Sequence, residues 1–489
     1  MPHSVPVSEV AAPDPRRWRI LAVSLVVGFM SLLDVSIVNV AIPSMQAGLD
    51  TSPGTIQWVV SGYALTFGLT LVAGGRLGDA YGRRRMMLVG LTGFVLSSAM
   101  VGLAPNVELV IAARLLQGAT AGLLTPQNSG LIQQLFTGDE RGKAFGLFGF
   151  TVSVASAAGP VIGGLIIAVA GEDDGWRWLF LVNVPIGAVA LLAVARMVPR
   201  RVRGEDEGDP RIDVPGAVLL GLTVICLLYP VVRLESGARL PLVLLAGVPL
   251  FGWAFAVWER RTARRGHPPL LDLALLRTLP GYLNGLAVGA LYFTGFTGLL
   301  LVLSVWLQDG LDYSPLETGL LLVPFAAGSA ISSPVAGRFV TRVGRGLTVA
   351  ALVTTIVGVV LTLVLAPGRE PLWLWLTPTL LLAGLGGGAV VSPNITLTLA
   401  EVPPRMGGAA GGALQTGQRI GASIGAALLV TAYQLTAARY DPDTAFRVSL
   451  AVGAVLLGLA LAMAVRAVRH PGGTAPASDA GSAPAQSRA

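Results

Sequence analysis

Apolar runs long enough to cross a lipid bilayer follow one another along almost the whole chain. A transmembrane helix needs about 20 consecutive apolar residues. The sequence holds fourteen such runs, near residues 20–42, 54–77, 86–104, 108–134, 143–169, 178–198, 214–232, 240–258, 280–307, 315–338, 346–366, 371–399, 407–436 and 444–466. Only 12% of the residues are charged, against about 25% in soluble chains. The sequence therefore predicts an all-α membrane protein with fourteen transmembrane helices.

The basic residues indicate how the chain is oriented. If the termini and the loops after even-numbered runs share one side, that side holds 26 of the 34 Lys and Arg, and the other side holds five. Cytoplasmic loops carry an excess of Lys and Arg. We therefore expect a multi-pass protein of the bacterial inner (cytoplasmic) membrane with both termini in the cytoplasm. This topology explains the net charge of +7 better than nucleic-acid binding does.

The chain also contains an internal repeat at an offset of 262 residues. The segment 46–53, QAGLDTSP, matches 308–315, QDGLDYSP. Two Gly-Arg pairs after the second run recur after the tenth. The repeat predicts two homologous six-helix halves with a substrate site between them. The expected divisions are an N-terminal cytoplasmic tail 1–19, a first half 20–198, linkers with two extra helices 199–279, a second half 280–466, and a disordered cytoplasmic tail 467–489.

An acidic residue, Asp34, lies well inside the first apolar run. An ionised side chain at that depth costs about 2.5–3.5 kcal/mol even on the lenient insertion scale. One interpretation is a protonated or paired acid that only tightens helix packing. The other is a proton-binding site on a transport path. Asp34 corresponds in the repeat to Phe296, so the acid is not part of the duplicated scaffold, which favours the proton site.

A basic residue at a similar depth offers Asp34 a partner. Arg114, Gln117 and Gly118 share one face of the fourth run by their spacing. At 1.5 Å per residue, Arg114 and Asp34 lie about 10 and 12 Å from the outer ends of their runs, the ends away from the cytoplasm. We therefore predict an Asp34–Arg114 pair, with a snorkelling Arg114 as the alternative.

The loop after the second run combines glycines, arginines and one acid. Glycines permit a tight turn and close helix approach, and ion pairs of the acid could hold the two halves together in one conformation. The alternative is a merely solvated basic loop. The residues concerned are Gly75, Arg76, Gly78, Asp79, Gly82, Arg83 and Arg84. They resemble the signature loop G-x-L-a-D-x-x-G-R-[KR] of the major facilitator superfamily.

Further motifs extend this resemblance over residues 18–466. Arg114 to Gly118 is similar to the R-x-x-q-G motif that the superfamily uses in proton transfer. The fifth run carries Gly159, Pro160, Gly163 and Gly164, similar to the G-P-x-x-G-G signature of its proton antiporters, although glycine packing alone could explain these residues. The segments 33–43 and 176–187 look like those of the fourteen-span drug–proton antiporters.

The resemblance implies the major facilitator fold, with two pseudo-symmetric halves and two extra central helices. It implies an exporter of amphipathic organic compounds, such as drugs, antibiotics or natural products, that works by alternating access. The expected energy source is the proton gradient, without a cofactor, metal or catalytic site, in a monomeric protein that binds no nucleic acid. By fold analogy, the following residues are cavity-lining candidates, each of which could instead pack between helices: Met30, Asn39, Gln57, Trp58, Gln117, Asn284, Tyr292, Phe293, Phe296, Asn394, Gln415 and Arg419.

Two other classes of function stay open. An exporter or importer of one metabolite, such as an amino acid, a siderophore or a sugar, would share the fold. A sensor or scaffold would need a substantial soluble module, and the segments between the apolar runs are too short for one.

Overall fold

The computed structural model describes residues 14–171, 174–200, 213–234, 240–267 and 269–469, apart from a few side chains that include those of Asn39 and Pro160. The described chain is helical throughout and has no strand, so the predicted all-α class is confirmed. The first seven helices are α1 (Arg17–Gly48), α2 (Pro53–Tyr81), α3 (Arg83–Gly102), α4 (Val107–Leu135), α5 (Gly138–Ala170), α6 (Gly175–Leu181) and α7 (Asn183–Met197). Then follow α8 (Val214–Leu234), α9 (Gly247–Arg264) and the short α10 (Leu273–Thr278). The last six are α11 (Pro280–Val305), α12 (Pro315–Val343), α13 (Arg345–Leu365), α14 (Leu372–Leu399), α15 (Gly407–Ala437) and α16 (Pro442–Arg469).

Within the described residues, thirteen helices are long and apolar enough to cross a membrane, with α6 and α7 counted as one. The prediction of fourteen is therefore not confirmed. The difference lies in α8, whose apolar stretch Val214–Pro230 is shorter than the others.

The internal repeat is visible in the helix ends. Helices α2 and α12 begin and end 262 residues apart. Each begins with a serine cap followed by proline, since Ser52 and Ser314 accept hydrogen bonds from backbone N–H groups three residues on. Each ends at a glycine with positive φ, 93° at Gly82 and 63° at Gly344. Only glycine adopts these angles without strain, so the paired glycines fix where both helices stop.

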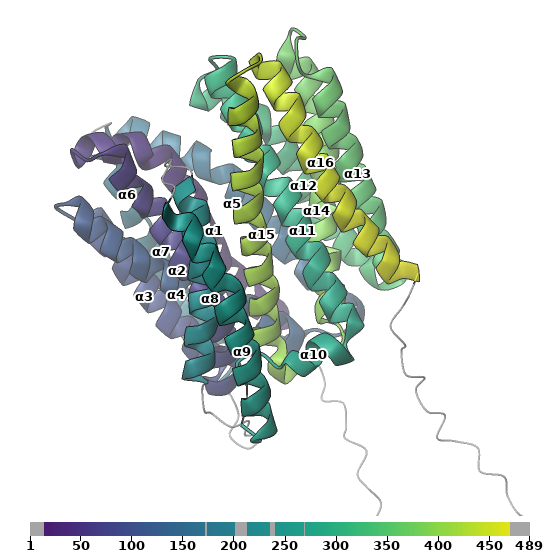
Figure 1. The fold of residues 1–489 in the computed structure, drawn as a ribbon. Coiled ribbons are helices and arrows are strands. Elements are labelled where there is room, and N and C mark those ends of the chain that lie inside the picture. The colour runs from purple at the N-terminus through teal and green to yellow at the C-terminus, as the bar shows by residue number, and fades with distance from the viewer. Residues whose placement is uncertain (1–13, 172–173, 201–212, 235–239, 268, 470–489) are drawn as a thin grey trace, which may run out of the picture.

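The helices form two bundles, α1–α7 and α11–α16, which lie side by side in Figure 1. We call the side that carries the α2–α3 loop the arginine-rich side. There the bundles share a core in which Ile132 and Phe145 of the first bundle meet Leu399 and Leu414 of the second. On the opposite side the bundles are apart, and α5 exposes Leu165 by 64% and Val169 by 81%.

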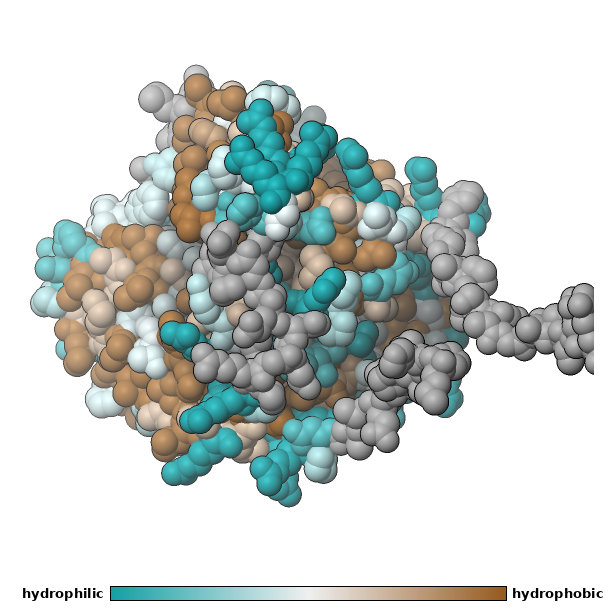
Figure 2. Space-filling view, turned by 90° about the horizontal axis from the view of Figure 1, so that it is seen from below, coloured by the Kyte–Doolittle hydropathy of each residue, from teal (hydrophilic) through white to brown (hydrophobic). Residues whose placement is uncertain are grey.

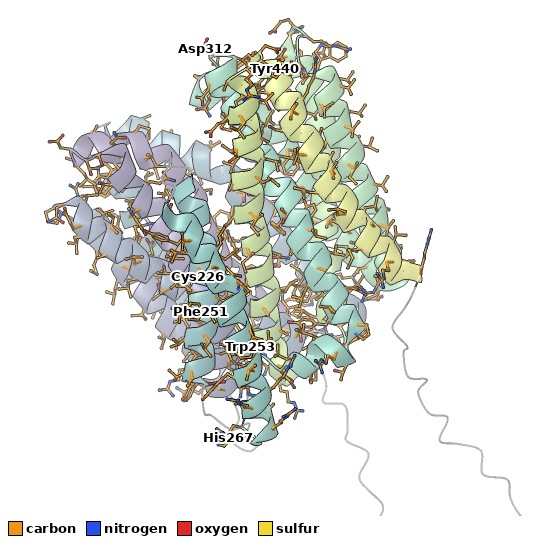
Figure 3. The ribbon with its side chains drawn as sticks, viewed as in Figure 1. Cys226, Phe251, Trp253, His267, Asp312 and Tyr440 are labelled. Carbon is orange, nitrogen blue, oxygen red and sulfur yellow. The ribbon has the colours of Figure 1, made fainter. Side chains whose placement is uncertain are left out.

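The two extra helices cover one edge of the junction between the bundles. Helix α8 packs against α2 and α15, and α9 packs against α8. Phe255 of α9 shares a small apolar cluster with Val72 of α2 and with Leu270, which precedes α10. Trp253 of α9, labelled in Figure 3, is 68% exposed. An exposed tryptophan of this kind suits a surface that faces lipid.

Candidate functional site

The Asp34 carboxylate lies at the centre of a buried polar cluster in the first bundle. Arg114 Nη1 of α4 lies 2.6 Å from Asp34 Oδ2. Gln117 Nε2 donates to Asp34 Oδ1 at 3.0 Å, and Asn183 Nδ2 of α7 donates to the same oxygen at 3.1 Å. Asp34 and Arg114 are each 1% exposed. The structure thus places the predicted pair in direct contact, with three donors on one carboxylate.

The Arg114 guanidinium has partners besides Asp34. Its Nε donates to the carbonyl of Val59 at 2.9 Å, and its Nη1 donates to Gln117 Oε1 at 2.8 Å. Its Cζ atom lies 4.2 Å from the ring centroid of Tyr63. Burying two charges is costly unless further hydrogen bonds complete their coordination. These contacts meet that requirement, and Arg114 therefore does not snorkel to the interface.

Sequence reasoning missed Asn183 as a member of this cluster. Its side chain also donates to Ser98 Oγ at 3.0 Å, which in turn donates to the carbonyl of Phe180 at 2.9 Å. Asn183 begins α7, just after the break from α6. The signal available was an amide inside an apolar run, in a segment that already resembled the drug–proton antiporters.

The glycine motif of α5 packs behind Asp34. A Cβ at Gly159 would overlap the side chain of Ser36, which donates to the carbonyl of Ala155 at 2.9 Å. Gly163 is buried, whereas a Cβ at Gly164 would meet nothing within 4 Å. The side chain of Pro160 lies outside the described residues. Gly159 therefore lets α5 approach α1 closely, two residues after the acid.

A second acid, Asp79, joins the two bundles on the arginine-rich side. Its carboxylate accepts the backbone N–H of Gly408 at 3.1 Å and that of Ala409 at 2.8 Å, in the first turn of α15. Arg83 Nη2 pairs with Asp79 Oδ1 at 3.0 Å and donates to the carbonyl of Pro404 at 3.0 Å. A carboxylate at a helix N-terminus meets unpaired N–H groups and the positive end of the helix dipole. We call this contact the Asp79 latch.

Glycines allow the close approach that the Asp79 latch needs. A Cβ at Gly75 would overlap the backbone of Gly408 in the other bundle, and a Cβ at Gly78 would overlap Gln127 of α4. Arg76 is half-buried, and Arg84 donates to the carbonyl of Ala195 in α7. Gly75, Asp79 and Arg83 therefore lie at the junction, whereas Gly78 and Arg84 pack within the first bundle, so the loop is not merely solvated.

The cavity-lining candidates fall into different environments. Gln415 donates to Ser129 Oγ of the first bundle at 3.1 Å, and Arg419 lies 4.8 Å from the ring centroid of Phe67, so both lie between the bundles. Gln117 belongs to the Asp34 cluster. Asn394 donates to the carbonyl of Gly285 at 3.1 Å, within the second bundle. Their predicted role in substrate binding stays a prediction.

The remaining candidates pack within one bundle or against α8. Tyr292 is 2% exposed, and its ring stacks on Phe296 at 5.2 Å between centroids and meets Phe293 edge-on at 5.3 Å. Met30 is buried in the core of the first bundle, and Trp58 lies 5.8 Å from Tyr229 of α8. Gln57 and Asn284 are half-buried, and the Asn39 side chain is outside the described residues.

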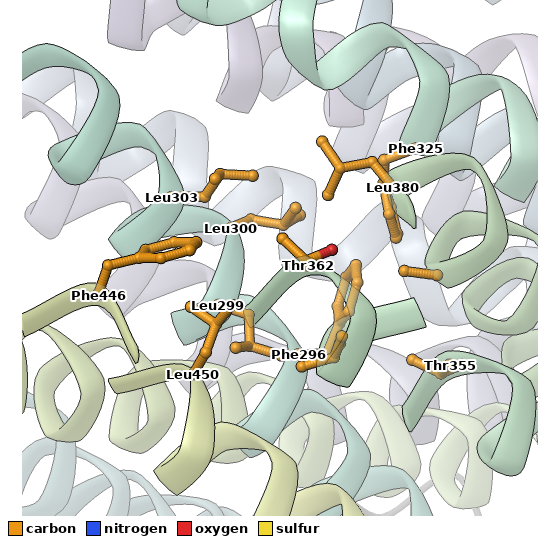
Figure 4. Close-up of a pocket in the computed structure, with 12 residues that line it drawn as sticks. Phe296, Leu299, Leu300, Leu303, Phe325, Thr355, Thr362, Leu380, Phe446 and Leu450 are labelled. Atoms are coloured by element: carbon orange, nitrogen blue, oxygen red, sulfur yellow. The ribbon is translucent and has the colours of Figure 1, made fainter. Parts of the chain in front are cut away.

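An apolar pocket lies inside the second bundle rather than between the bundles (Figure 4). It encloses about 390 Å³ of empty space, including solvent at its mouth. Its walls include Phe296, Phe325, Leu380 and Phe446. The polar groups of the Asp34 cluster are not among its lining residues.

Comparison with known proteins identifies the family. The sequence model of the Major Facilitator Superfamily matches residues 24–426, which is most of the chain. The chain belongs to the Major Facilitator Superfamily. Among superfamily relatives, it is 38% identical over 470 residues to the puromycin resistance protein pur8 of Streptomyces alboniger, covering 94% of this chain and 91% of the relative. It is 35% identical over 460 residues to the probable actinorhodin transporter of Streptomyces coelicolor, covering 91% of this chain and 79% of the relative.

A solved transporter structure shares the fold. The human organic anion transporter MFSD10 superposes with a TM-score of 0.66 at 18% identity, over 92% of this chain and all of that one. The predicted major facilitator fold is therefore confirmed. The superfamily and the names of these relatives indicate that this multi-pass membrane protein is a transporter and not an enzyme.

Proposed function

We propose that this superfamily member is a fourteen-span antiporter that exports amphipathic organic compounds in exchange for protons. Support comes from relatives named for puromycin resistance and actinorhodin transport. The observation that carries the proposal is the buried Asp34–Arg114 pair, with its 2.6 Å contact. An intramembrane acid held this way is usually functional, and the energy source here is the proton gradient alone.

The chemistry of coupling follows from the cluster. An ionised Asp34 accepts from Arg114, Gln117 and Asn183. A proton on Asp34 cancels the charge that compensates Arg114 and takes away one acceptor site, so the cluster must rearrange. A ligand shifts a conformational equilibrium only by its differential affinity for the two states. Here the proton favours a state in which the cluster is loosened, and bound substrate favours the state with the ion pair.

The conformation of this structure corresponds to the step of the transport cycle in which substrate leaves. The Asp79 latch closes the arginine-rich side, and the bundles are apart on the opposite side. With the arginine-rich side and both termini in the cytoplasm, this state faces outward. Opening inward then requires that α15 leave Asp79. The six-helix halves 20–198 and 280–466 move against each other within one monomer.

Everted membrane vesicles test the proposal. With an acidic interior, wild-type protein should accumulate an amphipathic compound such as puromycin or rhodamine 6G and collapse the pH gradient on its addition. Asp34→Asn should fold yet lose both effects. Asp174→Asn removes an acid from an ion pair in which Asp174 is 75% exposed and should behave as wild type. Gradient-driven extrusion from the vesicles would instead indicate a symporter, and transport unaffected by the gradient a uniporter.

A further inference from the structure

A basic groove lies where α5 and α12 meet on the arginine-rich side. It is lined by Asp139, Lys143, Arg338, Phe339 and Arg342, all of which are exposed. Three cations therefore face one carboxylate. Asp139 accepts a hydrogen bond from Thr341 of α12, which ties that carboxylate into the junction. Hydrophilic residues are distributed over this face of the molecule (Figure 2).

Both walls of the groove continue as apolar stripes along the membrane-spanning helices. On α12, Ile331, Val335 and Phe339 are 61%, 48% and 46% exposed, at a spacing of four residues. On α5, Leu147 and Phe150 are 36% and 41% exposed, above Lys143 on the same face. Each stripe thus ends in positive charge at the arginine-rich side. An anionic phospholipid has a matching order, with apolar acyl chains attached to a negatively charged headgroup.

Comparison with the pseudo-symmetric junction shows that no described helix covers this groove as α8 covers its counterpart. The matching junction of α2 with α15 is covered by α8, which contacts both helices. There the α2 acid, Asp79, fills the position that Thr341 takes in α12. Within the described residues, the α5–α12 junction therefore has neither a covering helix nor, at position 341, the carboxylate of its counterpart.

We propose that the α5–α12 groove binds the headgroup of an anionic phospholipid. Its phosphate would lie among Lys143, Arg338 and Arg342, and its acyl chains along the two stripes. Basic pockets between transmembrane helices on the cytoplasmic side bind such headgroups. Because Lys143 belongs to one bundle and the arginines to the other, the complete groove exists only while the arginine-rich side is closed. Bound lipid therefore stabilises the latched conformation.

The test uses the purified full-length protein and phosphatidylglycerol. Native mass spectrometry and thermal stability are measured in nanodiscs with phosphatidylglycerol or with phosphatidylcholine. Each cation removed should weaken phosphatidylglycerol binding about fivefold. The variants are Arg338→Gln with Arg342→Gln, and Lys143→Gln alone on the opposite wall. The control, Arg261→Gln with Arg264→Gln, removes two exposed charges of α9 on the same side.

Loss of the phosphatidylglycerol preference in both groove variants, with retention in the control, supports the site. If the groove variants and the α9 variant lost the phosphatidylglycerol preference equally, the preference would come from general surface charge, and the proposed site would be overturned. A second outcome would also overturn the lipid site. If glycerol phosphate or inorganic phosphate stabilised the detergent-solubilised protein as much as phosphatidylglycerol does, the groove would bind a free phosphate instead. The single Lys143→Gln substitution alters an exposed side chain only, so the test stands if the double variant fails to fold.

Discussion

The Asp79 latch can be weakened by replacing one oxygen atom. Asp79 accepts two backbone N–H groups of α15 and pairs with Arg83. In Asp79→Asn, the amide oxygen can still accept one of these bonds, but the amino group cannot accept the other. The negative charge at the N-terminus of α15 is lost as well. The closed arginine-rich side therefore loses stabilisation that the open state never had.

The magnitude follows from those contacts. A hydrogen bond to a charged group contributes about 1.5–3 kcal/mol, and a charge at a helix terminus adds up to about 2 kcal/mol. Because asparagine keeps part of the contact, we expect a net loss of about 2–3 kcal/mol, which shifts the closed–open equilibrium about 30- to 150-fold.

Spin-label distances can measure this shift. Labels at Arg85→Cys and Arg405→Cys, both exposed on the arginine-rich side of different bundles, should report a long-distance population in Asp79→Asn that is minor in the wild-type background. The free Cys226 is replaced by alanine in all samples. Asp174→Asn, an exposed ion-pair variant, should leave the distances unchanged. An unchanged distribution in Asp79→Asn would refute the latch.

Three further predictions concern packing around the site. Gly159→Ala should lower stability by about 1–3 kcal/mol because the new methyl group overlaps a serine of α1, whereas Gly164→Ala should have little effect; thermal unfolding compares the two. Asn183→Ala should lower the free energy of unfolding by about 1–3 kcal/mol, because it removes a donor from the buried carboxylate. A loss no greater than that of an exposed Asn→Ala change would contradict the place of Asn183 in the cluster. Arg419→Gln and Phe67→Leu should show a coupling of about 0.5–2 kcal/mol in a double-mutant cycle, and additive effects would show that the ring contact contributes nothing.

Local sequence signals predicted most of the fold. The apolar runs predicted the helices, and the structure adds that Ser52, Ser314, Gly82 and Gly344 act within a few residues of the helix ends that they define. The 262-residue repeat then related the two halves without any tertiary information. The predicted count of fourteen spans is not confirmed, because the described apolar stretch of α8 ends at Pro230.

The site was predictable only in part, because its members come from different helices. Matching depth was enough to pair Asp34 with Arg114. Nothing local showed that the start of α7 reaches the same carboxylate, so Asn183 was missed. Likewise, Trp58 meets Tyr229 of an extra helix far along the chain. Which face of a helix meets a cavity depends on packing that one sequence does not reveal.

If Asp34 carries the exchanged proton, substrate binding to the purified protein must release a proton from it. Purified protein in weakly buffered detergent solution, with a pH-indicator dye, is mixed with the compound that best collapses the gradient in vesicles. We expect proton release by the wild-type protein and by Asp174→Asn, and none by Asp34→Asn although the compound still binds. Equal proton release by Asp34→Asn would show that the proton site lies elsewhere in the molecule.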